Sequence, residues 1–341
     1  MIEKIAYIVK DNGAVICRCF GSGAYAEIPS EVCGLPVVEL ADHCFAPEPS
    51  VRIPRHQLLY AVRDGENYTA RNSIMPEGSE DVREPLCGDR LREIYLPDGL
   101  RAVGDYAFYN CIGLSKIRFP ASVARMGGGA FVACNHLQAV VFQTGEPADG
   151  EGETFSSGCL KAVITDISYE IEADLTDRGG TLFCSLLFPE YYEDSQENTP
   201  ARIIEIKYEG TGYKYRQSFR GKEINLPQYD SLFYLASVQE LPSTVLRLAL
   251  LRLRTPVQMT AEAKEEYLAY LRDHAGEAAE YVLDEANMDL LPVLCDSGFF
   301  TADILEQFIA KAGEHKKAAA VSLLLDYRRK HFPVKRKKYE F

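Results

Sequence analysis

The densest group of chemically reactive side chains in the sequence lies between residues 190 and 216. It combines carboxylates, a phenol and a guanidinium: Glu190, Tyr191, Glu193, Asp194 and Arg216. Paired carboxylates can coordinate a hard cation or act as a general acid and base. The spacing matches no calcium-binding loop, so the favoured interpretation is a solvated acidic loop anchored by tyrosines. A ligand site here, or an enzyme site that also uses Tyr229, is the alternative.

The common motifs of catalysis and metal binding are missing from the sequence. The six histidines never occur in the spacing of a helix-borne zinc site, and the ten cysteines include no Cys-x-x-Cys pair. There is no Gly-x-Ser-x-Gly elbow, and Gly127-Gly128-Gly129 lacks the Gly-Lys-Ser/Thr of a phosphate loop. The sequence therefore predicts a protein that is not an enzyme and uses no metal or cofactor.

A period of 23 residues organises residues 91–165. Several columns of like residues share this step: Leu91, Leu114, Leu137 and Leu160; Ile94, Ile117, Val140 and Val163; Phe108 and Phe131; Cys111 and Cys134. A unit of this length cannot bury its apolar face alone. The units must therefore stack, and the core must form between them.

Each repeat unit is expected to begin with a short strand that ends at a proline. In the first strand, alternation sends Ile94 inward and sends Glu93 and Tyr95 outward. The proline that follows stops strand pairing where its missing N–H costs least. Further along the unit, the phenylalanines are predicted to stack as an aromatic ladder, and the cysteines to line a bend where only a small group fits.

These residues resemble the BspA-type leucine-rich-repeat family, in which a unit reads like Leu-x-x-Ile-x-Leu-Pro-x-x-Leu/Val-x-x-Ile-Gly-x-x-Ala-Phe-x-x-Cys. The match is specific over residues 91–142 and is recognisable again over residues 28–45. It is looser in the unit after residue 142, where Phe155 sits one residue late. The resemblance implies a solenoid with a binding surface. Members of the family are often displayed outside the cell, so a surface adhesin-like binder is a second alternative.

The predicted fold class is α+β, with a leucine-rich-repeat solenoid, a strand-rich non-repeat region and a C-terminal array of helical pairs. The repeat domain is assigned to residues 1–165, with an insertion at 46–88 that fits no repeat and is expected to project from one face. Residues 166–241 keep strand character without the period, and residues 242–332 have helical spacing. The helical part resembles ankyrin-type helix pairs in architecture, although it lacks the Thr-Pro-Leu-His signature.

Residues 333–341 form a basic tail. Its lysines and arginines are expected to complement the C-terminal end of a helix and to keep the chain end hydrated. An acidic ligand or a membrane surface that binds the tail is the alternative.

The outward strand positions of the repeats form the predicted binding face. From one unit to the next they read Glu93 and Tyr95, Lys116 and Arg118, Ala139 and Val141, Ala162 and Ile164. The change from charged to apolar predicts that another segment or a second subunit covers the apolar end. The charged end is then the predicted partner site, and it suits an acidic or aromatic partner.

Charge and hydropathy limit the classes of partner. The formal net charge of −13 argues against general nucleic-acid binding, because phosphates would be repelled. The first residues are charged at Glu3, Lys4, Lys10 and Asp11, which leaves no apolar core for a secretory signal, and no apolar run is long enough to span a membrane. The sequence therefore predicts a cytoplasmic interaction scaffold that binds a protein partner of unknown identity.

Overall fold

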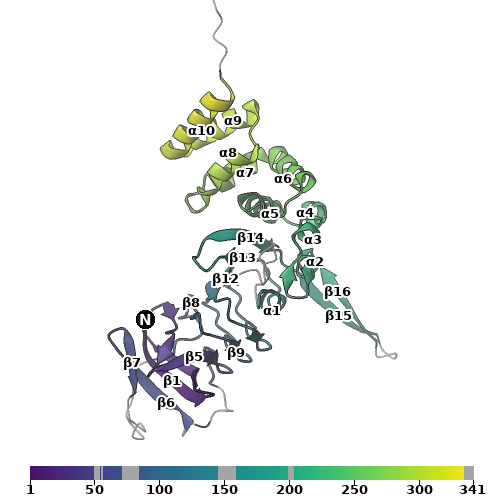
Figure 1. The fold of residues 1–341 in the computed structure, drawn as a ribbon. Helices are drawn as coiled ribbons and strands as arrows, with labels where there is room; N and C mark the ends of the chain where they lie inside the picture. Colours follow the sequence, from purple (N-terminus) through teal and green to yellow (C-terminus); the bar gives the residue numbers. More distant parts are fainter. Residues whose placement is uncertain (50–53, 55–56, 71–83, 145–158, 199–202, 334–341) are drawn as a thin grey trace, which may run out of the picture. The chain divides into compact units, whose positions relative to one another are not determined.

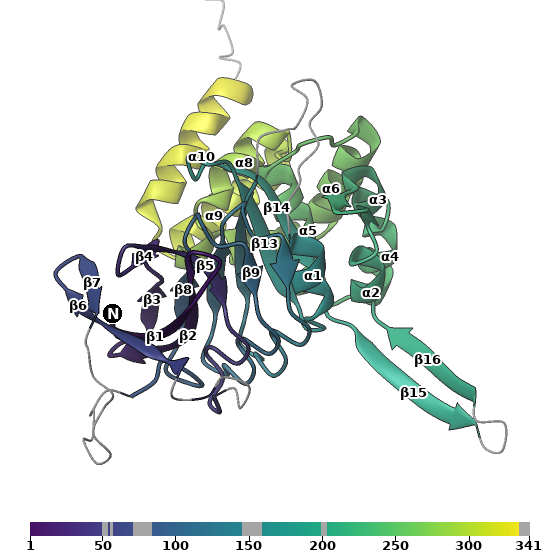
Figure 2. The same ribbon diagram turned by 60° about the horizontal axis from the view of Figure 1, so that its bottom comes forward.

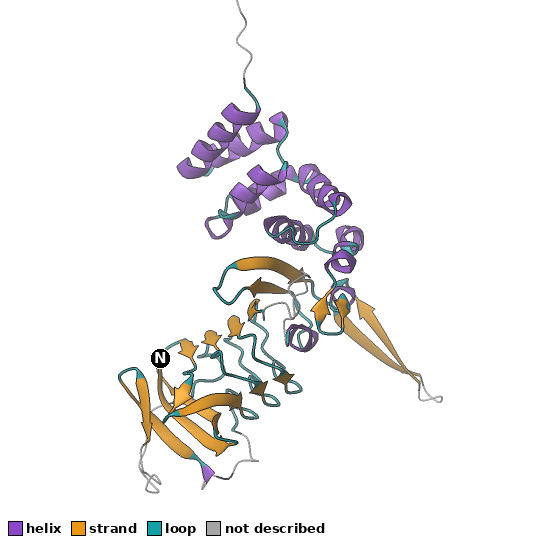
Figure 3. Cartoon of the chain, in the orientation of Figure 1, coloured by secondary structure: helices purple, strands orange, loops and turns teal. Residues whose placement is uncertain are grey.

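The computed structural model describes residues 1–49, 54, 57–70, 84–144, 159–198 and 203–333. The chain divides into two compact units, Met1–Asn225 and Leu226–Phe341. In the described residues the first unit carries the strands and the second is helical (Figures 1 and 3). The sequence placed the start of the helical part at residue 242, whereas its first helix begins at Leu226.

One sheet of the first unit runs in the order β11-β9-β5-β2-β1-β6-β7, with β4 paired to β5. Its strands are β1 (Ile2–Lys10), β2 (Gly13–Gly21), β4 (Glu31–Val32), β5 (Leu35–Leu40), β6 (Leu59–Asp64), β7 (Asn67–Ala70), β9 (Ala102–Val103) and β11 (Arg125–Met126). From β2 through β5 and β9 to β11 the strands are parallel, so the second strand of each repeat unit lies beside that of the unit before.

The second sheet of this unit runs in the order β14-β13-β12-β10-β8-β3. Its strands are β3 (Tyr25–Glu27), β8 (Glu93–Tyr95), β10 (Lys116–Phe119), β12 (Ala139–Gln143), β13 (Ile171–Thr176) and β14 (Leu182–Phe188). In this sheet Ile94 pairs with Ile117 and Ile117 with Val140, the register that the 23-residue step predicts. Ala26 pairs with Ile94, so a repeat unit also begins near residue 25.

Two aromatic stacks lie in the core of the first unit. The rings of Phe108 and Phe131 lie 5.2 Å apart at 7°, which confirms the predicted ladder, and Phe45 extends it at 5.3 Å. Phe119 and Phe142 form a second stack at 4.9 Å. All five side chains are buried. Stacked rings add to the free energy gained from burial, so these residues are a major part of the core.

The predicted cysteine positions lie at the bends between units. The Cys111 thiol donates to the carbonyl oxygen of Phe45 at 3.1 Å, and the Cys134 thiol donates to that of Phe108 at 3.0 Å. Each thiol therefore satisfies a carbonyl of the preceding unit. Burial raises the pKa of the Cys134 thiol to about 12, so it is protonated and able to donate at neutral pH.

Glycines allow successive units to approach at backbone contact distance. A Cβ on Gly127 would lie 2.3 Å from the carbonyl carbon of Gly104, and a Cβ on Gly104 would lie 2.5 Å from the amide nitrogen of Asp42. Aspartates complete the contact, because Asp42 Oδ1 accepts from the Asp105 amide at 2.9 Å and Asp105 Oδ1 accepts from the Gly128 amide at 3.0 Å. The close spacing of successive units thus depends on glycines, which have no side chain, and on the short side chains of the aspartates.

The repeat expected to begin at Leu160 is not a strand. Residues Leu160–Thr165 form helix α1, with Leu160, Val163 and Ile164 on its buried side. The expectation was wrong because Leu-x-x-Val also fits the i, i+3 spacing of one helix face, and a short apolar run does not distinguish the two. Strand β13 lies beside β12 instead, and β14 follows antiparallel. The sheet therefore continues past residue 165, where the repeat domain was expected to end.

The insertion at residues 46–88 contributes to a sheet rather than forming only a projecting loop. Its strands β6 and β7 form a hairpin, and β6 pairs antiparallel with β1. The expectation failed because the 23-residue period does not report a strand that pairs outside the repeats. Residues 50–53, 55–56 and 71–83 of the insertion lie outside the described residues, as do residues 334–341 of the basic tail.

The rest of the first unit is a hairpin followed by short elements. Among the described residues, strands β15 (Tyr192–Asn198) and β16 (Ile203–Glu209) pair antiparallel only with each other. They are drawn as an isolated ribbon in Figure 2. After them come α2 (Gly212–Tyr215), β17 (Phe219–Arg220) and β18 (Glu223–Ile224).

The described part of the second unit consists of helices: α3 (Leu226–Asp230), α4 (Phe233–Gln239), α5 (Pro242–Arg254), α6 (Ala261–Asp273), α7 (Ala275–Val282), the 3-10 helix Glu285–Asn287, α8 (Leu290–Ser297), α9 (Ala302–Glu314) and α10 (Ala318–His331). Thr260 and Thr301 cap α6 and α9, and each side-chain oxygen accepts a hydrogen bond from the amide three residues later. None of the helices described is both long and apolar enough to cross a membrane.

The aromatic stack gives a test of how the first unit is stabilised. Phe108→Ala removes a buried ring with stacking partners on both sides, so we expect a loss of about 3–5 kcal/mol in the free energy of unfolding. Tyr109→Ala removes an exposed ring beside it and should cost much less. Hydrogen exchange of the β8 and β10 amides in urea would report the first unit alone. Equal losses in the two variants would contradict this account.

Candidate functional site

Two neighbouring parallel strands bring the predicted partner-binding side chains together. Glu93 on β8 pairs with Lys116 on β10, and Tyr95 pairs with Arg118. Between them Ile94 and Ile117 point into the core and are fully buried. Because side chains alternate along a strand, the four polar residues must emerge on the opposite face of the sheet.

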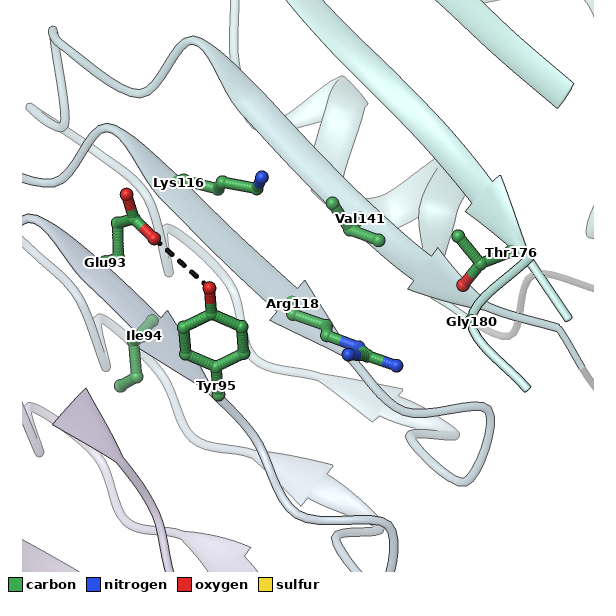
Figure 4. Close-up of a pocket in the computed structure, with 8 residues that line it drawn as sticks. All are labelled: Glu93, Ile94, Tyr95, Lys116, Arg118, Val141, Thr176 and Gly180. Carbon is green, nitrogen blue, oxygen red and sulfur yellow. Dashed lines mark hydrogen bonds between the residues drawn. The ribbon is translucent and has the colours of Figure 1, made fainter. Parts of the chain in front are cut away.

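These four side chains line one pocket on that face (Figure 4). The pocket has a volume of about 190 Å³, and its other lining residues include Val141, Thr176 and Gly180. Val141 comes from β12, Thr176 from β13 and Gly180 from the turn after β13. Sequence reasoning missed Thr176 and Gly180, since they lie beyond the last clear repeat and follow no period.

The phenol of Tyr95 and the carboxylate of Glu93 interact within the pocket. The Tyr95 hydroxyl donates to Glu93 Oε2 at 3.2 Å, drawn as a dashed line in Figure 4. Burial, and then the negative charge of Glu93, raise the pKa of Tyr95 above its ordinary value. The phenol is therefore neutral at physiological pH and holds the carboxylate on the β8 side of the pocket.

The two cations of the pocket lack such a partner. Neither Lys116 nor Arg118 lies within ion-pair distance of a carboxylate among the residues that the structure describes. With the Gln143 amide oriented to suit its neighbours, its oxygen accepts from Arg118 Nη2 at 3.3 Å and its nitrogen donates to Asp98 at 3.2 Å. The guanidinium is thus positioned by a neutral group, and its charge is available to a ligand.

A wider groove adjoins the pocket and shares Tyr95 and Arg118 with it. Its volume is about 840 Å³, and its lining includes two further arginines, Arg63 on β6 and Arg178 after β13. Arg63 donates to the carbonyl oxygen of Gly65 at 2.8 Å. The insertion therefore supplies a wall of the groove, a contribution that its sequence does not signal.

The sequence predicted that the outward strand positions become apolar along the sheet. The structure shows that they do not. Ala139 and Val141 are followed by Glu172 and Asp174 on β13, which occupy the next positions in register. Asp174 accepts a hydrogen bond from the Ser185 hydroxyl on β14. Ala162 and Ile164 belong to α1, where Ile164 is fully buried. The predicted apolar patch over Val141 and Ile164, and the need to cover it, are therefore wrong.

The second predicted site, the cluster at residues 190–216, does not form because Arg216 is buried away from the acidic side chains. This guanidinium is 1% exposed and donates to five backbone carbonyl oxygens: those of Ile164 and Ile167 at 2.9 Å, Pro189 at 2.5 Å, Gly212 at 3.0 Å and Tyr169 at 2.8 Å. Ile164 is near the end of α1, where carbonyl groups lack helical partners and favour a cation. Arg216 therefore joins α1 to the hairpin base and does not face a ligand.

The acidic members of that cluster lie on the surface. Glu190, Glu193 and Asp194 are exposed, whereas the ring of Tyr191 lies 5.0 Å from the Arg216 guanidinium. Tyr229 is fully buried in α3 of the second unit. Arg216 and Tyr229 are thus each buried within their own unit, so neither side chain is exposed as the predicted enzyme site would require. In the part of the chain that is described, no group of histidine, cysteine, aspartate and glutamate side chains could hold a metal ion.

Comparison with known proteins supports the interpretation of the repeats. Residues 86–173 match the sequence model of the BspA type leucine rich repeat region, in six copies. This segment is a BspA-type leucine-rich-repeat region. The four pocket residues Glu93, Tyr95, Lys116 and Arg118 lie within it.

Among solved structures, a leucine-rich-repeat protein of T. pallidum is similar at 22% identity, over 40% of this chain and 68% of that chain, with a TM-score of 0.20. No curated protein matches the chain. The assignment therefore depends on the repeat sequence and on the register of the strands.

Arg216 can be tested as a structural residue. Arg216→Met leaves several buried carbonyl groups without a donor, so we expect the free energy of unfolding to fall by about 3 kcal/mol or more. Arg220→Met removes an exposed arginine nearby and should change it by about 0.5 kcal/mol or less. Urea denaturation followed by hydrogen exchange in β13 measures both. An Arg216→Met variant as stable as the wild type would contradict this structural role.

Proposed function

We propose that the first unit is a protein-interaction scaffold that binds an acidic segment of a protein partner on the outward face of β8 and β10. The observation that carries the proposal is the pair of cations Lys116 and Arg118 in one pocket, without a carboxylate partner among the described residues. On this proposal the stacked units form a solenoid, whose strand face can vary without disturbing the core.

The chemistry of the pocket suits a carboxylate ligand. A guanidinium can donate two parallel hydrogen bonds to one carboxylate, and such charge-assisted bonds are stronger than neutral ones. Lys116 would add a second positive charge on the same side of β10. Tyr95, 37% exposed, offers a ring for apolar contact. Tyrosine and arginine are the residue types that contribute most often to the energy of protein interfaces.

The repeat region supports binding in preference to catalysis. Leucine-rich repeats present an extended surface, and the pocket residues come from the ends and middle of several strands. Arg216, on which the alternative enzyme site depended, donates to backbone carbonyl groups instead. The same face would serve equally in an adhesin-like binder, because the chemistry of the pocket does not depend on whether the protein acts inside the cell or on its surface.

A synthetic peptide provides the direct test. The probe is a fluorescently labelled peptide of alternating glutamate and tyrosine, titrated with the full chain and followed by polarisation. We expect Lys116→Ala with Arg118→Ala to weaken binding at least about tenfold, since one charge-assisted contact contributes about 1.5–3 kcal/mol. Arg125→Ala should leave binding unchanged, because Arg125 pairs with Glu39 on the other sheet.

A lysine and tyrosine peptide controls for the sign of the charge. Any binding of this peptide to the acidic chain should be unaffected by Lys116→Ala with Arg118→Ala, and raising the salt concentration should weaken binding of the acidic peptide. Failure of the wild-type chain to bind the acidic peptide would overturn the proposal. Equal weakening by Arg125→Ala would also overturn it, since binding would then reflect general charge and not this pocket.

A further inference from the structure

The hairpin of β15 and β16 is an isolated two-stranded ribbon. Neither strand pairs with a third among the described residues (Figures 1 and 2). Two strands on their own are marginally stable in water, and their unpaired edges invite association. We call residues 190–195 and 206–209 of this hairpin the acidic arm.

The acidic arm carries an exposed tyrosine between carboxylates. Tyr192 is 62% exposed and pairs with Glu209 across the ribbon, so both side chains are on one face. The Glu190 carboxylate accepts a hydrogen bond from the Tyr192 phenol and thereby raises the pKa of Tyr192. Asp194 lies two residues further along the same face, opposite Lys207. This face therefore combines one aromatic ring with a surplus of negative charge.

The base of the acidic arm is anchored to the body of the unit. The rings of Tyr208 and Tyr213 stack at 3.7 Å, and Tyr191 contacts both. Tyr191 also packs on the buried Arg216, which holds α1. The stacked rings lie on the opposite face of the ribbon from Tyr192, so they orient the arm and leave the face of Tyr192 and Glu209 exposed.

We propose that the acidic arm of one copy of this chain binds the pocket of Glu93, Tyr95, Lys116 and Arg118 on a second copy. The argument is charge complementarity, since the arm offers carboxylates beside a phenol and the pocket offers two cations beside a phenol. This inference rests on the proposed function and names the partner as a second copy.

The geometry determines what kind of assembly would form. The arm and the pocket are different surfaces, so the contact is heterologous and leaves a free arm at one end of the assembly and a free pocket at the other. Such contacts produce rings or open chains and not only dimers. The Debye length is about 10 Å in 0.1 M salt and becomes shorter as the salt concentration rises. The attraction between these exposed charges, and with it the assembly, should therefore weaken at higher salt.

Charge reversal in both partners gives the test, with sedimentation velocity of the full chain over a range of concentrations. The arm variant is Glu190→Lys with Glu209→Lys, and the face variant is Lys116→Glu with Arg118→Glu. We expect the wild-type mass to rise with concentration and each variant to remain monomeric. A mixture of the two variants, and a chain that carries all four substitutions, should assemble again because the charges are once more complementary.

The control for the arm variant is Glu262→Lys with Glu285→Lys. It changes the net charge by the same amount as the arm variant, on exposed residues of the second unit. This variant should assemble like the wild type. Circular dichroism checks that every variant is folded. A wild-type chain that stays monomeric at all concentrations overturns the inference, as does a mixture or a four-substitution chain that fails to assemble.

The peptide titration separates this inference from the proposed function. If the acidic peptide binds through Lys116 and Arg118 while the wild-type chain remains monomeric, the inference fails and the proposed function stands. If the peptide does not bind and no assembly forms, both fail. Assembly that the arm variant and the face variant each abolish, and that their mixture restores, supports both.

Discussion

The close stacking of each repeat unit on the one before is the constraint on which the first unit depends. Gly104 and Gly127 let the backbones touch, and the phenylalanine ladder fills the space that this approach creates. A side chain at either glycine would push the units apart and break the register of both sheets. Neighbouring strands then lie about 4.8 Å apart, and residues 23 positions apart in the chain become neighbours in space.

The candidate site is a direct consequence of that register. The inward positions of β8 and β10 must be apolar, whereas the outward positions are free to carry charge. Stacking therefore places Lys116 beside Glu93 and Arg118 beside Tyr95 without any loop or cofactor to organise them. The neighbouring strands and turns complete the lining of the pocket with Val141, Thr176 and Gly180.

Three arginines show how the same side chain takes different roles in this chain. Arg216 gives its hydrogen bonds to carbonyl groups around α1, and Arg252 pairs with Asp230 in the second unit at 2.7 Å. Both are almost fully buried, and both donate hydrogen bonds to acceptors of their own unit. Arg118, by contrast, emerges on the sheet face. The difference is one of position relative to the core and cannot be seen in the identity of the residue.

The sequence by itself determined the repeat period, the register of β8, β10 and β12, the aromatic ladder and the four polar residues that share the pocket. These follow from local periodicity, since a 23-residue step and strand alternation leave little choice. Tertiary structure alone decided that residues 160–165 are a helix, that β13 brings Glu172 and Asp174 beside Val141, and that Arg216 is buried. Each of these depends on which distant segment packs against the chain, and local spacing contains no information about that choice.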